Sequence, residues 1–241
     1  MASKGYLRFK NRLVKFREDC ELAEVVVNNK EQLKGEGVIF EKINAEAFPL
    51  LSARQDSIGS RTLVAKHLRS TIYVAFVKEL YEELTEYLHY ILRQGAQNGV
   101  DPNRVVGDNN ITMQANDILS KGKKELDKMI IDQIFRKLEN RRSTIDLINQ
   151  IRNRLGLDID QQLVEAAIPY LETRHIFVHA DGKPEQLFLE RFPNIQLDNN
   201  KKIALNAGFA TNAYFAVKEL VKAFDREMLA RNYFPASEMQ P

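Results

Sequence analysis

Two long stretches of this chain carry apolar residues at every third or fourth position, and this spacing restricts the fold more than any other feature. The first stretch runs from Tyr6 to Val27 and the second from Leu68 to Ile91. Because an α-helix turns once in about 3.6 residues, this spacing gathers the apolar side chains on one helix face. The stripes comprise Tyr6, Phe9, Leu13, Phe16, Cys20, Ala23 and Val27, then Leu68, Ile72, Phe76, Leu80, Leu84, Leu88 and Ile91. The sequence therefore predicts a long N-terminal helix with a narrow apolar stripe and a long central helix that packs against other elements on several sides.

Three further helical regions follow along the chain. A helical pattern covers about residues 111–138, and Ser143 is placed to cap a short helix after it. Another helix is expected from about Asp160, with Pro169 inside it. A proline there either kinks the helix or begins a new one. A last helix is expected over about residues 208–231, with Phe215, Leu220, Val221 and Phe224 on its apolar stripe.

Glycine, proline and asparagine mark the connections between these helices. Residues 34–60 and 95–110 are rich in them and are predicted as loops, the first with room for one short helix. Residues 194–205 alternate apolar and polar side chains around a DNNK turn, which predicts one small β-hairpin. The fold class is therefore all-α, a helical bundle with one minor hairpin near the C-terminus.

The same pattern suggests how the chain is organised. Residues 1–59 are expected to form an N-terminal helix and loop that pack on the bundle, and residues 60–234 the main helical domain. Residues 235–241 are expected to form a flexible tail.

Composition excludes several classes of protein. Hydrophobic residues make up 44% of the chain and charged residues 28%, which is typical of a folded globular protein and not of a disordered one. The longest apolar run, Ile72 to Val77, is too short to cross a bilayer. The N-terminus is charged from Lys4 onward and does not resemble a secretory signal, and a single cysteine rules out an internal disulfide. We therefore expect a cytoplasmic protein that does not span a membrane.

Charge is unevenly placed on a chain whose net charge is only +2. Residues 1–17 and 121–154 are basic, whereas Glu79, Glu82, Glu83 and Glu86 form an acidic cluster at helical spacing. Basic tracts can bind the phosphates of nucleic acids, and they can equally be solvated helix faces. The sequence leaves both interpretations open.

The stretch ETRHIFVHADGKP, residues 172–184, holds two of the four histidines of the chain. On a helical wheel, His175 falls with the apolar stripe of its helix, while Arg174 and His179 lie on opposite sides of it. His175 and His179 have the i, i+4 spacing of a zinc-binding pair. However, no glutamate directly follows the first histidine and the adjacent arginine would repel a cation, so the sequence disfavours a metal site.

Two other interpretations remain for this stretch. A histidine on an apolar face is commonly a buried, hydrogen-bonded part of the core. In a catalytic site, His179 would move a proton to or from a hydroxyl group, and Arg174 would stabilise the growing charge of a phosphate. If that hydroxyl is a ribose 2′-OH, the reaction is metal-free RNA cleavage, which leaves 2′,3′-cyclic phosphate and 5′-OH ends. One imidazole cannot be both base and acid at once, and a two-fold dimer would supply a second one.

The run from Arg174 to His179, followed by Ala180, Asp181 and Gly182, resembles the R-x4-6-H motif of the HEPN superfamily of helical-bundle proteins, nearest to its RiboL-PSP-HEPN or MAE-28990-like branch. The resemblance extends over roughly residues 60–230. A second match to the motif, from Arg61 to His67, stands at the start of a long helix with no glycine-containing exit, and we interpret it as a decoy.

The resemblance implies a metal-independent endoribonuclease that needs no cofactor and works as a homodimer with a shared active cleft. It also implies a toxin–antitoxin or anti-phage defence setting, with an antitoxin or defence-system protein as a possible partner. Arg174 and His179 would be the catalytic pair, with His175, Asp181 and Lys183 positioning RNA. The alternative for Lys183 is a solvated lysine of the loop. Glu79 or Glu83, on the preceding long helix, would be available to line the cleft, and they can equally belong to a solvated acidic face. The alternative is a non-catalytic HEPN-type binding or scaffold protein in which the motif is structural.

Overall fold

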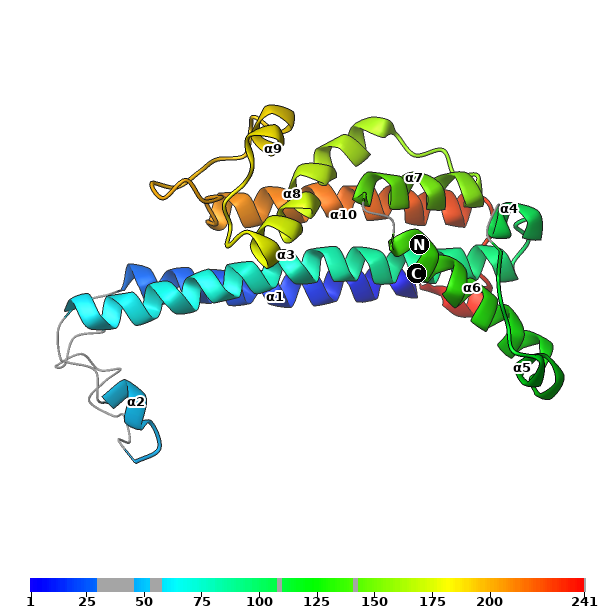
Figure 1. Ribbon diagram of the computed structural model, residues 1–241, viewed down its shortest axis with the longest axis horizontal. Coiled ribbons are helices and arrows are strands. Elements are labelled where there is room, and N and C mark those ends of the chain that lie inside the picture. Colours follow the sequence, from blue (N-terminus) through cyan, green and yellow to red (C-terminus); the bar gives the residue numbers. More distant parts are fainter. Residues whose placement is uncertain (30–45, 53–57, 108–109, 141–142, 241) are drawn as a thin grey trace.

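Helices α1 (Lys4–Asn28) and α3 (Ile58–Gln97) run antiparallel, side by side, and form the base of the bundle (Figure 1). The computed structural model describes residues 1–29, 46–52, 58–107, 110–140 and 143–240. In this part of the chain the remaining helices are α2 (Pro49–Ser52), α4 (Pro102–Val106), α5 (Ala115–Ser120), α6 (Lys123–Glu139), α7 (Thr144–Leu155), α8 (Gln161–His179), α9 (Gln186–Arg191) and α10 (Ala207–Ala230). The all-α prediction is confirmed.

Both predicted stripes face the interface between α1 and α3. Phe9 and Leu13 of α1 are buried, as are Phe76 and Leu80 of α3. Helices α6, α7, α8 and α10 also pack on α3, so it is the central element that its wide stripe predicted. Leu68 departs from the pattern, because its side chain is 47% exposed near the end of α3 that projects beyond α10 (Figure 1).

The other predicted helices are present with changed bounds. The expected helix over 111–138 is divided into α5 and α6 at Gly122, and Ser143 caps α7 by accepting a hydrogen bond from the Asp146 N–H at 3.3 Å. Helix α8 runs without interruption through Pro169, so the alternative in which Pro169 begins a new helix is wrong. Phe215 of α10 was expected on the buried stripe, but it is 47% exposed.

The two predicted loops contain more helix than expected. In 95–110, α3 continues to Gln97 and α4 forms a further turn, capped by the Asp101 side chain. In 34–60, α2 is the expected short helix, and α3 already begins at Ile58. Residues 34–45 and 53–57 lie outside the described residues.

Strand structure is minor and joins the two ends of the chain. The predicted hairpin over 194–205 is reduced to one antiparallel bridge between Leu197 and Ile203. The two-stranded sheet pairs β1 (Ala2–Ser3) with β2 (Met239–Gln240). The prediction of a flexible tail is therefore wrong for the described residues up to Gln240, because the Glu238 carboxylate also accepts a hydrogen bond from the Tyr90 hydroxyl at 3.0 Å.

A buried carboxylate fixes this junction, which we call the termini clamp and define by Ser3, Tyr87 and Asp225. Asp225 accepts hydrogen bonds from the Ser3 N–H at 3.1 Å, from the Ser3 hydroxyl and from the Tyr87 hydroxyl at 3.0 Å. All three residues are buried. Burial raises the pKa of Tyr87, and the neighbouring Asp225 raises it further. The clamp ties the N-terminus to α3 and α10.

The acidic cluster serves partly to hold α1 on α3. Arg8 pairs with Glu86 at 3.0 Å and Arg12 pairs with Glu83 at 2.9 Å. Because these ion pairs neutralise part of the basic N-terminal tract, not all of its cationic side chains are available to bind a polyanion.

None of the described helices is long and apolar enough to cross a membrane.

Candidate active site

The residues of the predicted motif lie at the C-terminal end of α8. The helix begins at the Asp160 cap, which accepts a hydrogen bond from the Gln162 N–H at 2.9 Å, and His179 is its last residue. The chain then turns through Asp181 and Gly182, which have φ values of 50° and 80°. A Cβ added to Gly182 would lie 2.8 Å from Cε1 of Phe177, so the turn needs glycine for both its conformation and its space.

His175 and His179 lie side by side at the surface. Their ring centroids are 4.6 Å apart, with an angle of 47° between the ring planes, and both side chains are exposed. The expectation that His175 follows the buried stripe is wrong. Helix α8 contacts α3, α7 and α10, and its buried residues shift from Val164 and Leu171 to Thr173 and Ile176, so one straight stripe does not describe it.

Arg174 is half-buried and leans on the central helix. Its guanidinium carbon lies 4.7 Å from the ring centroid of Tyr81 on α3, a cation–π contact. Burial raises the pKa of Tyr81, while the charge of Arg174 lowers it. The buried Nε of Arg174 has no hydrogen-bond partner among the described residues. Within that part of the chain, no side-chain hydrogen bond or ring contact joins Arg174 to His175 or His179.

The two residues expected to position RNA after the helix differ in their surroundings. Asp181 is exposed and forms an ion pair with Nζ of Lys202 at 2.5 Å, and this hydrogen bond lowers the pKa of its carboxyl group. Lys183 is exposed, and its backbone N–H donates to the Ala180 carbonyl at 2.9 Å. The Ile203 N–H donates to the Gly182 carbonyl at 2.9 Å, so the turn after α8 is tied to the bridge at Ile203.

Sequence reasoning missed Tyr81 and Lys202, the two partners of the motif. Tyr81 precedes Arg174 by 93 positions and Lys202 follows Asp181 by 21 positions. Periodicity marks Tyr81 only as one aromatic residue of a long helix. Nothing in the sequence signals either contact.

Glu83, one of the two glutamates considered for the lining of the cleft, is buried away from the motif. Its side chain is 3% exposed and pairs with Arg12 of α1. Burial raises the pKa of its carboxyl group, and the cationic Arg12 opposes that rise. In the second match to the motif, from Arg61 to His67, His67 is exposed on α3, whereas the side chain of Arg61 lies outside the described residues.

A metal centre at the histidines receives no support from their surroundings. The described residues include no group of three or more histidine, cysteine, aspartate and glutamate side chains placed to hold an ion. Two imidazoles alone fall short of the three protein ligands that catalytic zinc sites use.

Protein-family models, curated proteins and solved structures were compared with the chain, and none of them matches it.

Proposed function

We propose that the protein is a metal-independent endoribonuclease whose active site is the end of α8. The observation that carries the proposal is the pair of exposed imidazoles, with ring centroids 4.6 Å apart, beside a half-buried arginine. An imidazole can accept or donate a proton near neutral pH, and a guanidinium binds phosphate oxygens. These are the groups that phosphodiester cleavage without a metal requires.

The reaction follows from these groups. His179 takes the proton from a ribose 2′-OH, and the 2′ oxygen forms a bond to the adjacent phosphorus as the bond from phosphorus to the 5′ oxygen breaks. The 5′ oxygen receives a proton from a second acid, and a 2′,3′-cyclic phosphate remains. Arg174 stabilises the charge on the phosphate, for which it must turn part of its guanidinium from Tyr81 toward the substrate. Asp181 and Lys183, on the turn after α8, position the strand.

Two sources can supply the second acid. His175 stands next to His179 in the same chain, and the His179 of a second copy would reach the site in a homodimer with a shared cleft. The second arrangement also doubles the arginines at the site. We propose the homodimer, in a toxin–antitoxin or anti-phage setting in which a partner protein restrains cleavage.

The test is cleavage of mixed RNA by purified protein in EDTA, followed by analysis of the product ends. The wild type is expected to give cyclic-phosphate and 5′-OH ends, and His179→Ala to lower the rate by at least about 100-fold. His67→Ala is the matched control, since it removes an exposed histidine from α3 outside the motif. Equal cleavage by the wild type and His179→Ala would refute the proposal.

A second candidate is a non-catalytic binding or scaffold protein, and the contact between Arg174 and Tyr81 favours it. If Arg174 serves only to join α8 to α3, Arg174→Ala lowers the melting temperature and no cleavage activity exists to be lost. Arg174→Lys separates the candidates. It keeps a cation over the ring but loses the planar fork of donors, so an enzyme would lose activity while its fold stayed intact.

A further inference from the structure

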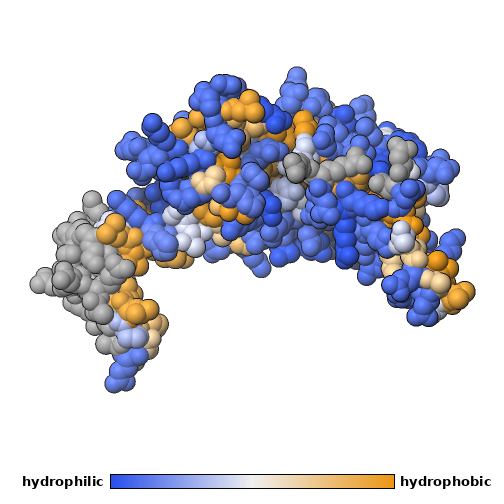
Figure 2. All heavy atoms as spheres, viewed as in Figure 1, coloured by the Kyte–Doolittle hydropathy of each residue, from blue (hydrophilic) through white to orange (hydrophobic). Residues whose placement is uncertain are grey.

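A chamber of about 660 Å³ lies between α8 and the segment after α9, apart from the two histidines. Its walls are mainly apolar and aromatic, formed by Ile145, Ile168, Pro169, Tyr170, Phe192 and Pro193. A smaller cavity of about 160 Å³ adjoins it and shares the lining residues Tyr170, Asn194 and Ile195. Apolar residues are visible at the surface around α9 (Figure 2). A mostly apolar hollow with a few polar groups at one end is typical of a small-ligand site.

Flat groups line the larger chamber. The guanidinium carbon of Arg191 lies 4.8 Å from the ring centroid of Phe192, and both residues line the chamber. Tyr170 packs edge-on against Phe209, with ring centroids 5.3 Å apart, and it lines the smaller cavity together with Asn212. Aromatic rings and guanidinium planes are the surfaces on which unstacked RNA bases lie. The chamber therefore offers aromatic and guanidinium surfaces for stacking.

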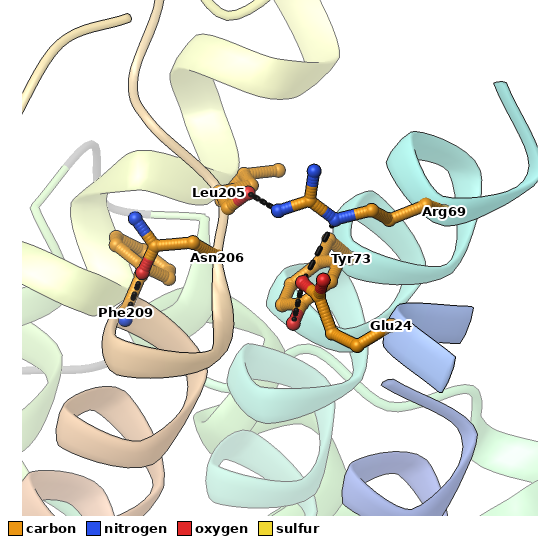
Figure 3. Close-up of polar contacts among 6 residues, drawn as sticks. All are labelled: Glu24, Arg69, Tyr73, Leu205, Asn206 and Phe209. Atoms are coloured by element: carbon orange, nitrogen blue, oxygen red, sulfur yellow. Dashed lines mark hydrogen bonds and ion pairs between the residues drawn. The ribbon is translucent and has the colours of Figure 1, made fainter. Parts of the chain in front are cut away.

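Amide side chains gather at the smaller cavity. Asn194 and Gln196 are exposed there, and their side chains form no hydrogen bond within the described part of the chain. Asn206 accepts a hydrogen bond from the Phe209 N–H at 2.9 Å through Oδ1, and this bond does not use its NH2 donors (Figure 3). An amide carries a donor and an acceptor in one plane, which is the pattern that pairs with base edges.

The segment that bears Asn206 is anchored to the long helices. Arg69 of α3 donates a hydrogen bond to the Leu205 carbonyl at 3.3 Å and another to Glu24 of α1 at 2.8 Å (Figure 3). The Tyr73 hydroxyl donates to the same carboxylate at 2.8 Å. This chain of bonds holds one wall of the smaller cavity against the base of the bundle. A rigid wall is what a site needs in order to distinguish one base edge from another.

We propose that the two cavities together bind an unstacked nucleobase of single-stranded RNA. The base lies on Phe192 and Arg191, and its edge faces the amides of Asn194 and Gln196. The inference rests on the proposed function in taking RNA as the ligand. Tyr170 and His179 stand nine positions apart on α8, about 14 Å along the helix, so one short strand can reach both places.

The test measures binding without cleavage. The probes are fluorescent 2′-O-methyl octamers of each of the four bases, which lack the 2′-OH that cleavage needs. Phe192→Leu keeps apolar volume but removes the aromatic plane, and we expect it to weaken binding of all four octamers roughly tenfold. Replacing Asn194 and Gln196 together by alanine is expected to flatten the preference among the four bases. Leu187→Ala, on α9 and outside the chamber, is the matched control and should bind like the wild type.

The outcomes separate this inference from the ribonuclease proposal. If the wild type binds no octamer, or if Phe192→Leu and the double amide variant bind like the wild type, the chamber is not a base site. Loss of RNA cleavage in His179→Ala would still support the nuclease in that case. If the variants lose affinity or base preference while no protein cleaves RNA, the base site stands and the nuclease fails. The double amide variant changes only exposed side chains, so it tests the site even if Phe192→Leu misfolds.

Discussion

The termini clamp and the end of α8 hold their polar side chains in opposite ways. At the clamp, the Asp225 carboxylate is 3% exposed and accepts hydrogen bonds from Ser3 and Tyr87. At the end of α8, His175 and His179 are exposed, and Asp181, whose side chain is 88% exposed, pairs with the half-buried Lys202. Burying a polar group costs free energy unless it is hydrogen-bonded, so the clamp is a structural device. We call the end of α8, with His175, His179 and Asp181, the open end, because its polar groups stay accessible to solvent.

The largest effect is expected from Asp225→Ala, which removes the acceptor at the centre of the clamp. The Ser3 N–H, the Ser3 hydroxyl and the Tyr87 hydroxyl would then be buried without a partner. We expect a loss of about 3 kcal/mol or more in the free energy of unfolding, measured by urea denaturation. Asp225→Asn keeps one acceptor oxygen and should lose less. If Asp225→Ala lost less than about 1 kcal/mol, the clamp would not stabilise the fold more than the end of α8 does.

A smaller loss is expected from Arg12→Ala, which leaves the buried Glu83 without its nearest cation. Because Arg12 is 52% exposed and water replaces part of its effect, we expect a loss of about 1–2 kcal/mol at pH 7. Burial already raises the pKa of Glu83, and the variant should raise it further. When the pKa of a carboxyl group is higher in the folded state than in the unfolded state, the free energy of unfolding falls as pH rises through the folded-state pKa.

The control for this variant is therefore pH itself. At a pH below the ordinary pKa of glutamate, about 4.3, Glu83 is protonated in both states and the loss in Arg12→Ala should shrink. Urea denaturation at the two pH values measures it. An equal loss at both would mean that Arg12 acts through packing and not through charge.

Much of the bundle could be predicted because helix periodicity is local. The stripes of α1 and α3, the Ser143 cap and the bounds of α10 all depend on residues within a few turns of one another. The clamp could not be predicted, because its hydrogen bonds join Ser3 to Asp225 across 222 positions. A period shows which face of a helix is buried, but it does not show which distant residue lies opposite.

The candidate site was predictable to a smaller extent. The sequence placed Arg174 and His179 at the end of a helix, and the structure has them there. The helical wheel misplaced His175, because α8 packs against different helices along its length. Nothing in the sequence indicated that Tyr81 contacts Arg174 or that Lys202 pairs with Asp181. That the motif cleaves RNA stays a prediction.

At the open end, Gly182→Ala is expected to cost about 1 kcal/mol, less than either change above. Its φ of 80° disfavours any side chain, and the new Cβ would approach Phe177. The turn after α8 should loosen while the clamp stays closed. Hydrogen exchange measured by mass spectrometry should show faster exchange near residues 176–183 and no change at β1. Gly99→Ala is the control, since it shares a positive φ but has open space around it.

The smallest effect is expected from Lys202→Ala, which breaks the exposed ion pair with Asp181. The hydrogen bond from Lys202 lowers the pKa of Asp181. A carboxyl group with a lowered pKa stabilises the folded state when the pH is above the ordinary carboxyl pKa, and this stabilisation is lost as pH falls through the folded-state pKa. The variant should move this pKa up toward its ordinary value, as followed by NMR titration, with little change in melting temperature because the pair is solvated. Lys201→Ala, at the neighbouring position, should leave the titration unchanged. If Lys202→Ala destabilised the protein as much as Asp225→Ala, the open end would be as firmly built as the clamp, and the contrast between them would fail.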